Sequence, residues 1–303
     1  MSKNTLNKAI LAASVVALIL AAGAAPASPT VREAPSASVA SAPAADSAVL
    51  EYKMPKGRAS TYLIKAEEAQ VMEVMGQSMD SNTTSTGTFA FKSKGLKEKN
   101  LLLGVTIDDL VITMTSGAQG DMSPDLSSVK GKSFDMVISP LGTDVDVSGA
   151  EAITYDMAGD TRNLSSGFKT FFPVLPGKRI KIGETWPSTS SIEEKSSSMN
   201  VRIDIQNVNT LEGFETIDGL ECARISTQAT GTISGSGSQM GQDLTFTGTT
   251  KGKDVWYFAV KEGLYVKATS EMTSEMSIDV AAANMSIPMT QTSKSEVKLT
   301  GKS

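Results

Sequence analysis

The segment Leu264–Val280 alternates between apolar and polar residues almost without exception, and this pattern limits what the chain can fold into. Apolar residues occupy most of its even positions, whereas Lys267, Glu271 and Glu275 lie at odd positions. Side chains alternate across a β-strand, so the segment predicts one strand with a buried face and a wet face. At about 3.3 Å per residue it would span about 55 Å, several times a typical strand. So long a strand normally belongs to a strongly twisted or curled antiparallel sheet.

The segment that follows predicts the partner strand, because Met285–Leu299 repeats the same alternation. A turn at 281–284 pairs Met276 with Met289, Ile278 with Ile287, Glu271 with Lys294, and Lys267 with Lys298. The Glu–Lys pair is a favourable cross-strand contact. The Lys–Lys pair counts against this register unless both ammonium groups reach open water.

The buried face of this hairpin is not uniform. It is apolar near the turn and again at the base, but polar residues lie between these two parts: Ser270, Ser274, Gln291, Ser293 and Ser295. A single continuous core would not place so many polar groups in mid-strand without partners. The hairpin is therefore predicted to cross two environments, a core at its base and a methionine-lined region at its tip.

The first 27 residues have the pattern of a secretory signal peptide. Lys3 and Lys8 precede an apolar run, Ala9–Leu20, and small residues suited to cleavage follow it. The run is too short for a good transmembrane helix, and no later segment qualifies. Residues 28–48 are rich in Ala, Ser and Pro and predict a disordered linker. We expect an exported protein, periplasmic or secreted, without a transmembrane segment after cleavage; a retained signal that acts as an anchor is the alternative.

The chain contains no histidine, and Cys222 is its single cysteine. The absence of histidine removes Ser-His and Cys-His catalysis and histidine-based metal sites. One cysteine forms no intramolecular disulfide, and its strand-like surroundings predict a buried thiol. Without residues 1–27 the chain keeps 26 basic against 33 acidic residues, a net charge of about −7, with no basic cluster. We therefore expect no nucleic-acid partner, no metal site and no cofactor.

One segment carries a helix pattern. Asp160 can cap a helix in which Leu164, Phe168, Phe171 and Phe172 share one face. Prolines directly after this run would end the helix. We expect a helix over 160–172, with its aromatic stripe packed on the sheet as core.

The remaining segments predict strands, divided into an N-terminal β region at 49–150, a helix and connection at 151–190, and a C-terminal antiparallel β region at 191–303. Near Asp108 and Asp109 the apolar parity shifts by one residue, as a β-bulge requires. The predicted fold class is mainly β: long curved antiparallel strands that form one or two half-barrel-like sheets, with one short helix.

No catalytic residue is predicted. The pattern Ser-x-x-Lys begins at Ser127, Ser166 and Ser295, but its companion motifs are absent, so we attribute the three matches to chance. The acidic pairs Asp108–Asp109 and Asp144–Asp146 could serve acid–base chemistry. Few aromatic residues surround them, and solvated surface acids are the better interpretation.

Methionines cluster around the tip of the long hairpin. Thioether sulfurs can bind Cu(I), but no histidine or second cysteine is available to complete such a site. Flexible methionines also line plain cores and adaptable apolar surfaces. The candidate ligand-binding residues are Met272, Met276, Met285, Met289, Phe168 and Phe171.

Three stretches carry a resemblance to known proteins: 171–186, with Leu-Pro-Gly and Gly-Glu-Thr-Trp; 217–225, with Ile-Asp-Gly, Cys and Ile; and 131–142, with Gly-Lys-Ser-Phe and Ser-Pro-Leu-Gly. They resemble uncharacterised exported β-rich bacterial proteins grouped as a DUF6263-like domain of unknown function. The likeness covers most of residues 50–300 and implies a fold and an exported location, but no reaction. More distantly, the pattern looks like the LolA and LppX type of periplasmic lipoprotein carriers, which hold acyl chains in a half-barrel.

These observations predict a non-catalytic cell-envelope protein that binds a lipid or other apolar small molecule on a sheet face lined by Met and Phe. Two alternatives stay open. One is a hydrolase that depends on carboxylates alone, and the other is a structural or interaction module with an envelope protein as its partner.

Overall fold

The computed structural model describes residues 46–303, except 118–119, 144, 158–159 and 240. The predicted signal peptide and most of the predicted linker lie outside the described residues. Ser47–Val49 forms a short strand, β1, which pairs with β9 (Arg179–Lys181). Regular structure thus includes the last two residues assigned to the linker.

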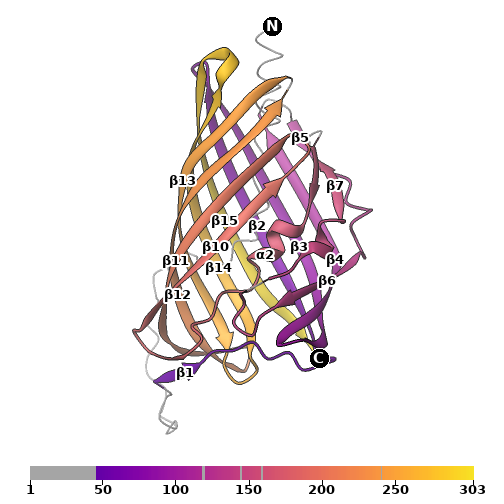
Figure 1. The fold of residues 1–303 in the computed structure, drawn as a ribbon, viewed down its shortest axis with the longest axis vertical. Helices are drawn as coiled ribbons and strands as arrows, with labels where there is room; N and C mark the ends of the chain where they lie inside the picture. Colours follow the sequence, from indigo (N-terminus) through magenta and orange to yellow (C-terminus); the bar gives the residue numbers. More distant parts are fainter. Residues whose placement is uncertain (1–45, 118–119, 144, 158–159, 240) are drawn as a thin grey trace, which may run out of the picture.

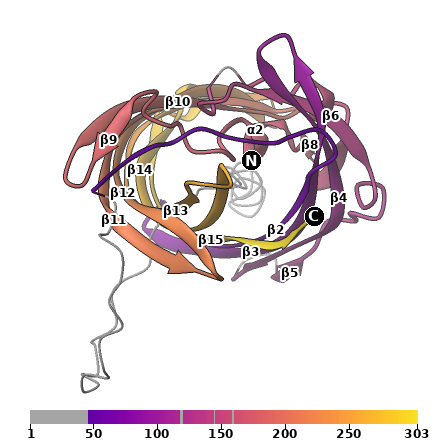
Figure 2. The same ribbon diagram turned by 90° about the horizontal axis from the view of Figure 1, so that it is seen from below.

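Most of the described chain lies in one large antiparallel sheet of 11 strands. In spatial order these are β10 (Thr185–Lys195), β11 (Met199–Ile217), β12 (Leu220–Gln239), β13 (Gln242–Ala259), β14 (Leu264–Val280), β15 (Met285–Lys302), β2 (Ala59–Val74), β3 (Gln77–Lys97), β4 (Asn100–Ser116) and β5 (Gly120–Met122), and β6 (Ser133–Ile138) pairs with β4. The sheet curls around an interior (Figure 2), and β10 pairs with β11 alone in the described residues. The predicted fold class is confirmed.

The long hairpin β14–β15 has the predicted register. Met276 pairs with Met289 and Ile278 with Ile287. The Lys294 ammonium lies 3.2 Å from the Glu271 carboxylate. Lys267 and Lys298 do lie opposite each other, and each ammonium has another carboxylate within 4 Å: Glu296 at 3.7 Å for Lys267, and Asp218 at 3.8 Å for Lys298.

A second prediction of local register is also confirmed, in the pairing of β3 with β4. The pairs Thr88–Asp109 and Phe89–Ile107 leave out Asp108, so the bulge lies where the apolar parity shifts. The residues that follow the bulge point their apolar side chains inward again, because the extra residue restores the alternation.

The predicted helix over 160–172 is wrong at both ends. Residues Asp160–Asn163 form strand β8, which pairs with β7 (Thr154–Met157), and the helix α2 covers only Ser165–Lys169. Asp160 does not cap the helix, because its carboxylate accepts hydrogen bonds from the hydroxyls of Ser196, Ser197 and Ser198. The Asn163 carboxamide oxygen instead accepts from the backbone N–H of Ser165 at 2.9 Å.

The connection between β6 and β10 lies along one side of the interior. It contains a 3₁₀ turn (Ser148–Ala150), β7, β8, α2 and β9. In Figure 2, α2 lies between β10 and β6, so this connection occupies the side of the interior where the two edges of the sheet are not paired.

The lower half of the interior is filled by an aromatic cluster, which we call the base cluster. Phe168 of α2 and the following Phe171 and Phe172 are buried, as predicted for the aromatic stripe. Phe171 stacks on Phe91 with ring centroids 4.8 Å apart and meets the edge of Tyr62 at 5.2 Å. The base cluster also contains Phe89, Phe134, Trp256, Phe258 and Tyr265. Cys222 is buried there, as predicted.

A second apolar cluster, the tip cluster, lies toward the β14–β15 turn. It contains Met72, Val74, Ile192, Met199, Val201, Ile203, Ile205, Ala229, Ile233, Leu244, Phe246, Met272, Met276, Ile278, Val280, Ile287 and Met289. The long hairpin therefore does cross two apolar environments, as predicted.

Candidate functional site

A band of inward-facing polar residues, the polar belt, separates the base cluster from the tip cluster. One row runs across six paired strands: Thr250, Ser274, Gln291, Gln70, Ser81 and Ser116. All six are buried. The neighbouring rows add Glu68 and Ser293, then Asp254, Ser270, Ser295 and Ser85. The interior of the curled sheet is thus polar at mid-height.

Contacts within the belt satisfy part of its polar groups. The Ser274 hydroxyl donates to Thr250 Oγ1 at 3.0 Å, and the Ser81 hydroxyl donates to Gln70 Oε1 at 3.4 Å. The Gln70 amide donates to the sulfur of Met289, which belongs to the tip cluster. Buried polar groups cost free energy unless they are paired, so these contacts let the belt exist inside the sheet.

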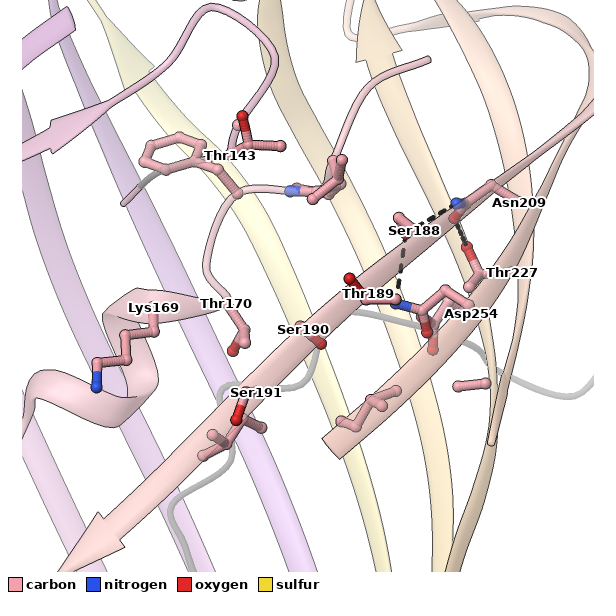
Figure 3. Close-up of a pocket in the computed structure, with 18 of the residues that line it drawn as sticks. Thr143, Lys169, Thr170, Ser188, Thr189, Ser190, Ser191, Asn209, Thr227 and Asp254 are labelled. Carbon is pink, nitrogen blue, oxygen red and sulfur yellow. Dashed lines mark hydrogen bonds between the residues drawn. The ribbon is translucent and has the colours of Figure 1, made fainter. Parts of the chain in front are cut away.

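A pocket of about 450 Å³ opens at the border between the belt and the two clusters. One side of the pocket is formed by β10, β11 and the inward residues of β12–β14 (Figure 3). The other side is formed by the connection, through Gly142, Thr143, Val145, Lys169, Thr170, Phe172, Pro173 and Val174. Its apolar side chains include Ile192, Ile205, Ala229 and Met272 from the tip cluster, and Trp256 and Phe172 from the base cluster.

A chain of hydrogen bonds orders the polar wall of this pocket. The Trp256 indole N–H donates to Thr227 Oγ1 at 3.0 Å, and the Thr227 hydroxyl donates to Asn209 Oδ1 at 2.8 Å. The Asn209 amide then donates to Ser188 Oγ at 3.1 Å and to the carbonyl of Trp186 at 3.2 Å. Three strands and the edge strand β10 are linked by these side chains, so the polar wall is rigidly placed.

Asp254 is the one carboxyl among the described residues that line the pocket. It lies on β13, two residues before Trp256, and burial raises its pKa from 3.8 to about 8, although the neighbouring Ser270 hydroxyl lowers it in part. None of the ion pairs in the described part of the chain includes Asp254.

A second group of ionisable side chains lies between α2 and the belt. Burial raises the pKa of Glu68 to about 8 and also raises that of Glu194, whereas the charge of Arg162 lowers both. Arg162 is buried, and its Nε and Nη2 donors have no acceptor among the described residues. The cavity beside Arg162 and Glu194 measures only about 10 Å³, so it holds no substrate.

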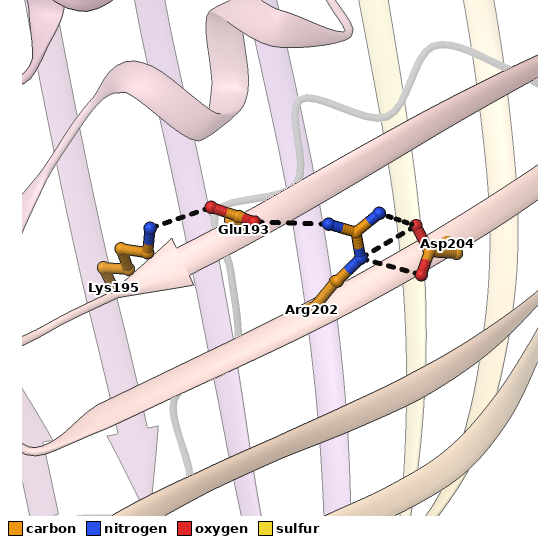
Figure 4. A network of polar contacts seen from close by, with 4 residues as sticks. All are labelled: Glu193, Lys195, Arg202 and Asp204. Carbon is orange, nitrogen blue, oxygen red and sulfur yellow. Dashed lines mark hydrogen bonds and ion pairs between the residues drawn. The ribbon is translucent and has the colours of Figure 1, made fainter.

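The outer face of the same strands carries a different set of charges. Arg202 lies between the carboxylates of Asp204, at 2.7 Å, and Glu193, at 3.3 Å, and Lys195 contacts Glu193 at 2.9 Å (Figure 4). The Arg202 guanidinium lowers the pKa of Asp204, and Lys195 lowers that of Glu193. The four side chains are largely exposed, and their charges neutralise one another, so they leave no unpaired charge to bind a ligand.

The six predicted ligand-binding residues are not gathered at one place. Met272 lines the pocket, Met276 and Met289 are buried in the tip cluster, and Met285 packs at its margin. Phe168 and Phe171 lie in the base cluster, outside the pocket. Their role in binding stays a prediction.

The polar wall of the pocket was not predicted. Asp254 and Thr227 lie on the inward parity of their strands, two residues from Trp256 and Ile225 respectively. The sequence signal for this wall is a polar residue at an inward position of a strand, the same signal that predicts the polar middle of the β14–β15 hairpin.

The acidic pairs considered for catalysis are not placed together in the pocket. Asp109 pairs with Lys130 at 2.9 Å on the surface, and Asp146 accepts a hydrogen bond from the Ser148 hydroxyl at 2.8 Å. Asp144 lies outside the described residues. Within the described ranges, no three His, Cys, Asp or Glu side chains are grouped so that they could hold a metal ion. No helix there is long and apolar enough to cross a membrane.

No protein-family model matches the chain, and no curated protein matches it. The resemblances to a DUF6263-like family and to lipoprotein carriers therefore stay predictions.

Comparison with solved structures gives weak similarities. One is to an exported protein with a YMCC-like fold from Bacteroides fragilis (TM-score 0.27, 8% identity, covering 84% of this chain and 99% of that chain). A second is to a DUF1329 family protein from Desulfovibrio piger (TM-score 0.19, 10% identity, covering 79% of this chain and 84% of that chain). A third is to OccK2 (OpdF) of Pseudomonas aeruginosa (TM-score 0.22, 8% identity, covering 80% of this chain and 98% of that chain). At these TM-scores the similarities carry no argument about fold or function.

Proposed function

We propose that this chain is an exported, non-catalytic binding protein of the cell envelope that holds an amphipathic or apolar small molecule inside its curled sheet. The observation that carries the proposal is the pocket of about 450 Å³ at the border of the polar belt. Its volume falls within the range of small-molecule sites, about 300–1,000 Å³. Its lining combines one apolar wall with a few ordered polar groups, which is typical of such sites.

The apolar wall of the pocket connects to the tip cluster, which the sequence singled out for its methionines. Met272 belongs to both, and Ile192, Ile205 and Ala229 extend the same apolar surface. Methionine side chains adapt to ligands of different shape because they are unbranched and polarisable. A flexible apolar chain is therefore a better match to this wall than a rigid polar metabolite.

The rival function, a hydrolase that depends on carboxylates, has less support. Acid–base chemistry by carboxylates alone needs two of them on either side of a substrate. Asp254 is the single carboxyl among the described residues lining the pocket of about 450 Å³, while Glu194 lines a cavity of about 10 Å³.

Native mass spectrometry of the protein purified from its own host tests the proposal. We expect a co-purifying small molecule that is lost on denaturation. The substitution Ser190→Trp places an indole in the pocket from the half-buried inner side of β10 and should abolish the bound mass. Thr247→Trp, at an exposed position on the outer face of β13, is the matched control and should retain it. A protein that carries no small molecule and binds no apolar probe would contradict the proposed function.

A further inference from the structure

The position of Asp254 in the pocket indicates the chemical class of the ligand, which the pocket volume alone does not. Its side chain belongs to the inward parity of β13, between Gly252 and Trp256, and it lines the pocket (Figure 3). Asp254 pairs in register with Ser270 of β14 and with Thr227 of β12, and the Ser270 hydroxyl lowers its pKa in part. A carboxyl in an apolar environment is costly unless it is paired or protonated.

The other donors in the polar wall are already engaged. The Trp256 indole donates to Thr227, the Thr227 hydroxyl donates to Asn209, and the Asn209 amide donates to Ser188 and to a backbone carbonyl. This chain of bonds leads from Trp256 on β13 through β12 and β11 to β10 and does not include Asp254. The carboxyl therefore keeps acceptor capacity that these donors do not fill.

The single cationic side chain among the described lining residues does not fill it either. Lys169 is at the end of α2, across the pocket, and its side chain is directed away from Asp254 (Figure 3). Lys169 is also absent from the charges that shift the pKa of Asp254. Among the described lining residues no cation faces Asp254, so a positive charge that complements its ionised form would come from the ligand.

We propose that the pocket binds an amphipathic molecule with a protonated amine, whose ammonium group pairs with Asp254 while its hydrocarbon chain lies against Ile205, Ala229 and Met272. This inference rests on the proposed function and names the chemical class of its ligand. The ammonium would donate charge-assisted hydrogen bonds to the carboxylate, which are about twice as strong as neutral ones. Trp256 also lines the pocket, and indole rings attract cations.

Isothermal titration calorimetry of the unaltered protein with three matched probes tests the head group. The probes are decylamine, decanol and decanoate, each kept below its micellar concentration at about pH 9, above the pKa of about 8 that burial gives Asp254, so that its carboxyl is ionised. We expect decylamine to bind at least roughly tenfold more tightly than decanol, because one charge-assisted pair is worth about that factor. Decanoate should bind most weakly, since its carboxylate would face Asp254.

The variant Asp254→Asn tests the residue. It keeps the shape of the side chain but removes the negative charge, so decylamine should fall to the affinity of decanol while decanol binding stays as it was. Asp243→Asn is the matched control, because Asp243 lies on the same strand but is exposed and outside the pocket. The control should keep the preference for the amine.

The outcomes separate the two proposals. Equal binding of all three probes to the unaltered protein would overturn the amine assignment and leave the binding function standing. An amine preference that survives in Asp254→Asn would overturn the role of Asp254. No binding of any probe would contradict the proposed function itself. Because the probe comparison uses the unaltered protein, the test holds even where the variant fails to fold.

Discussion

The base cluster and the polar belt are formed by the same strands, yet one is filled and the other leaves a pocket. At the base, inward positions carry Tyr62, Phe89 and Phe91, whose rings pack on those of the 168–172 segment. At the belt, the same strands carry serine, threonine, glutamine and glycine at their inward positions. The curl of the sheet is continuous, so side-chain volume decides whether its interior is a core or a binding site.

The strongest test of this comparison removes an aromatic ring from the base. Phe171→Ala deletes a side chain that contacts Phe91, Tyr62, Phe168 and Phe172. Because the surrounding rings cannot close the resulting cavity, we expect a loss of about 3–5 kcal/mol in the free energy of unfolding, measured by urea denaturation.

The control for this test lies in the same cluster. Tyr265→Phe removes a buried hydroxyl that has no hydrogen-bond partner in the described part of the chain and leaves the ring in place. We expect this substitution to be neutral or stabilising. If Phe171→Ala costs less than about 1 kcal/mol, the base is not the rigid core that the contacts imply.

The second test addresses the tip cluster. Met276→Ala removes a buried side chain that pairs with Met289 and packs beside Gly248. We expect a loss of about 2–3 kcal/mol, smaller than for Phe171, because the flexible neighbouring methionines can move into the space. A loss equal to or larger than that of Phe171→Ala, measured by the same denaturation, would show that the tip is packed as tightly as the base.

The sequence predicted this contrast along one hairpin but not around the whole interior. The alternation in Leu264–Val280 predicted the strand, the register of its hairpin and the polar residues at its middle. Each of these features depends only on residues of β14 and β15. The pocket depends on residues from β10 to β14 and on the connection that faces them. Asp254 and Asn209 both pair in register with Thr227, but Lys169 and Thr170 of the connection face them only through the curl of the sheet, which no local pattern encodes. The helix prediction was wrong for a related reason: Asp160 has a tertiary partner, the serines at 196–198.

A third test uses the pH dependence of the free energy of unfolding to measure how far water is excluded from the polar belt. Burial raises the pKa of Glu68 from 4.5 to about 8, so the folded protein keeps a proton that the unfolded chain loses above about pH 4.5. The free energy of unfolding should therefore fall as the pH rises from about 4.5 to about 8 and level off above that range. Asp254, raised from 3.8 to about 8, contributes in the same direction.

The variant Glu68→Gln should flatten this pH dependence by roughly 1–2 kcal/mol between pH 5 and pH 8, a figure reduced for the partial exposure of the side chain. Glu67→Gln is the matched control, because Glu67 is exposed on the outer face of the same strand and should leave the dependence unchanged. A flat profile for the unaltered protein would mean that water reaches the belt freely and that the carboxyls are ionised throughout.

The smallest effect is expected on the outer face, where charges are paired in solvent rather than in the interior. Arg202→Gln breaks the contacts with Asp204 and Glu193 in the exposed network of Figure 4. Exposed ion pairs are screened and contribute little, so the melting temperature should fall by less than about 2 °C, and by still less in about 1 M salt. Both readings come from calorimetric melting at the two salt concentrations. A larger fall that persists in high salt would mean that the outer face stabilises the curl of the sheet, and the contrast between base and belt would then not be set by the interior alone.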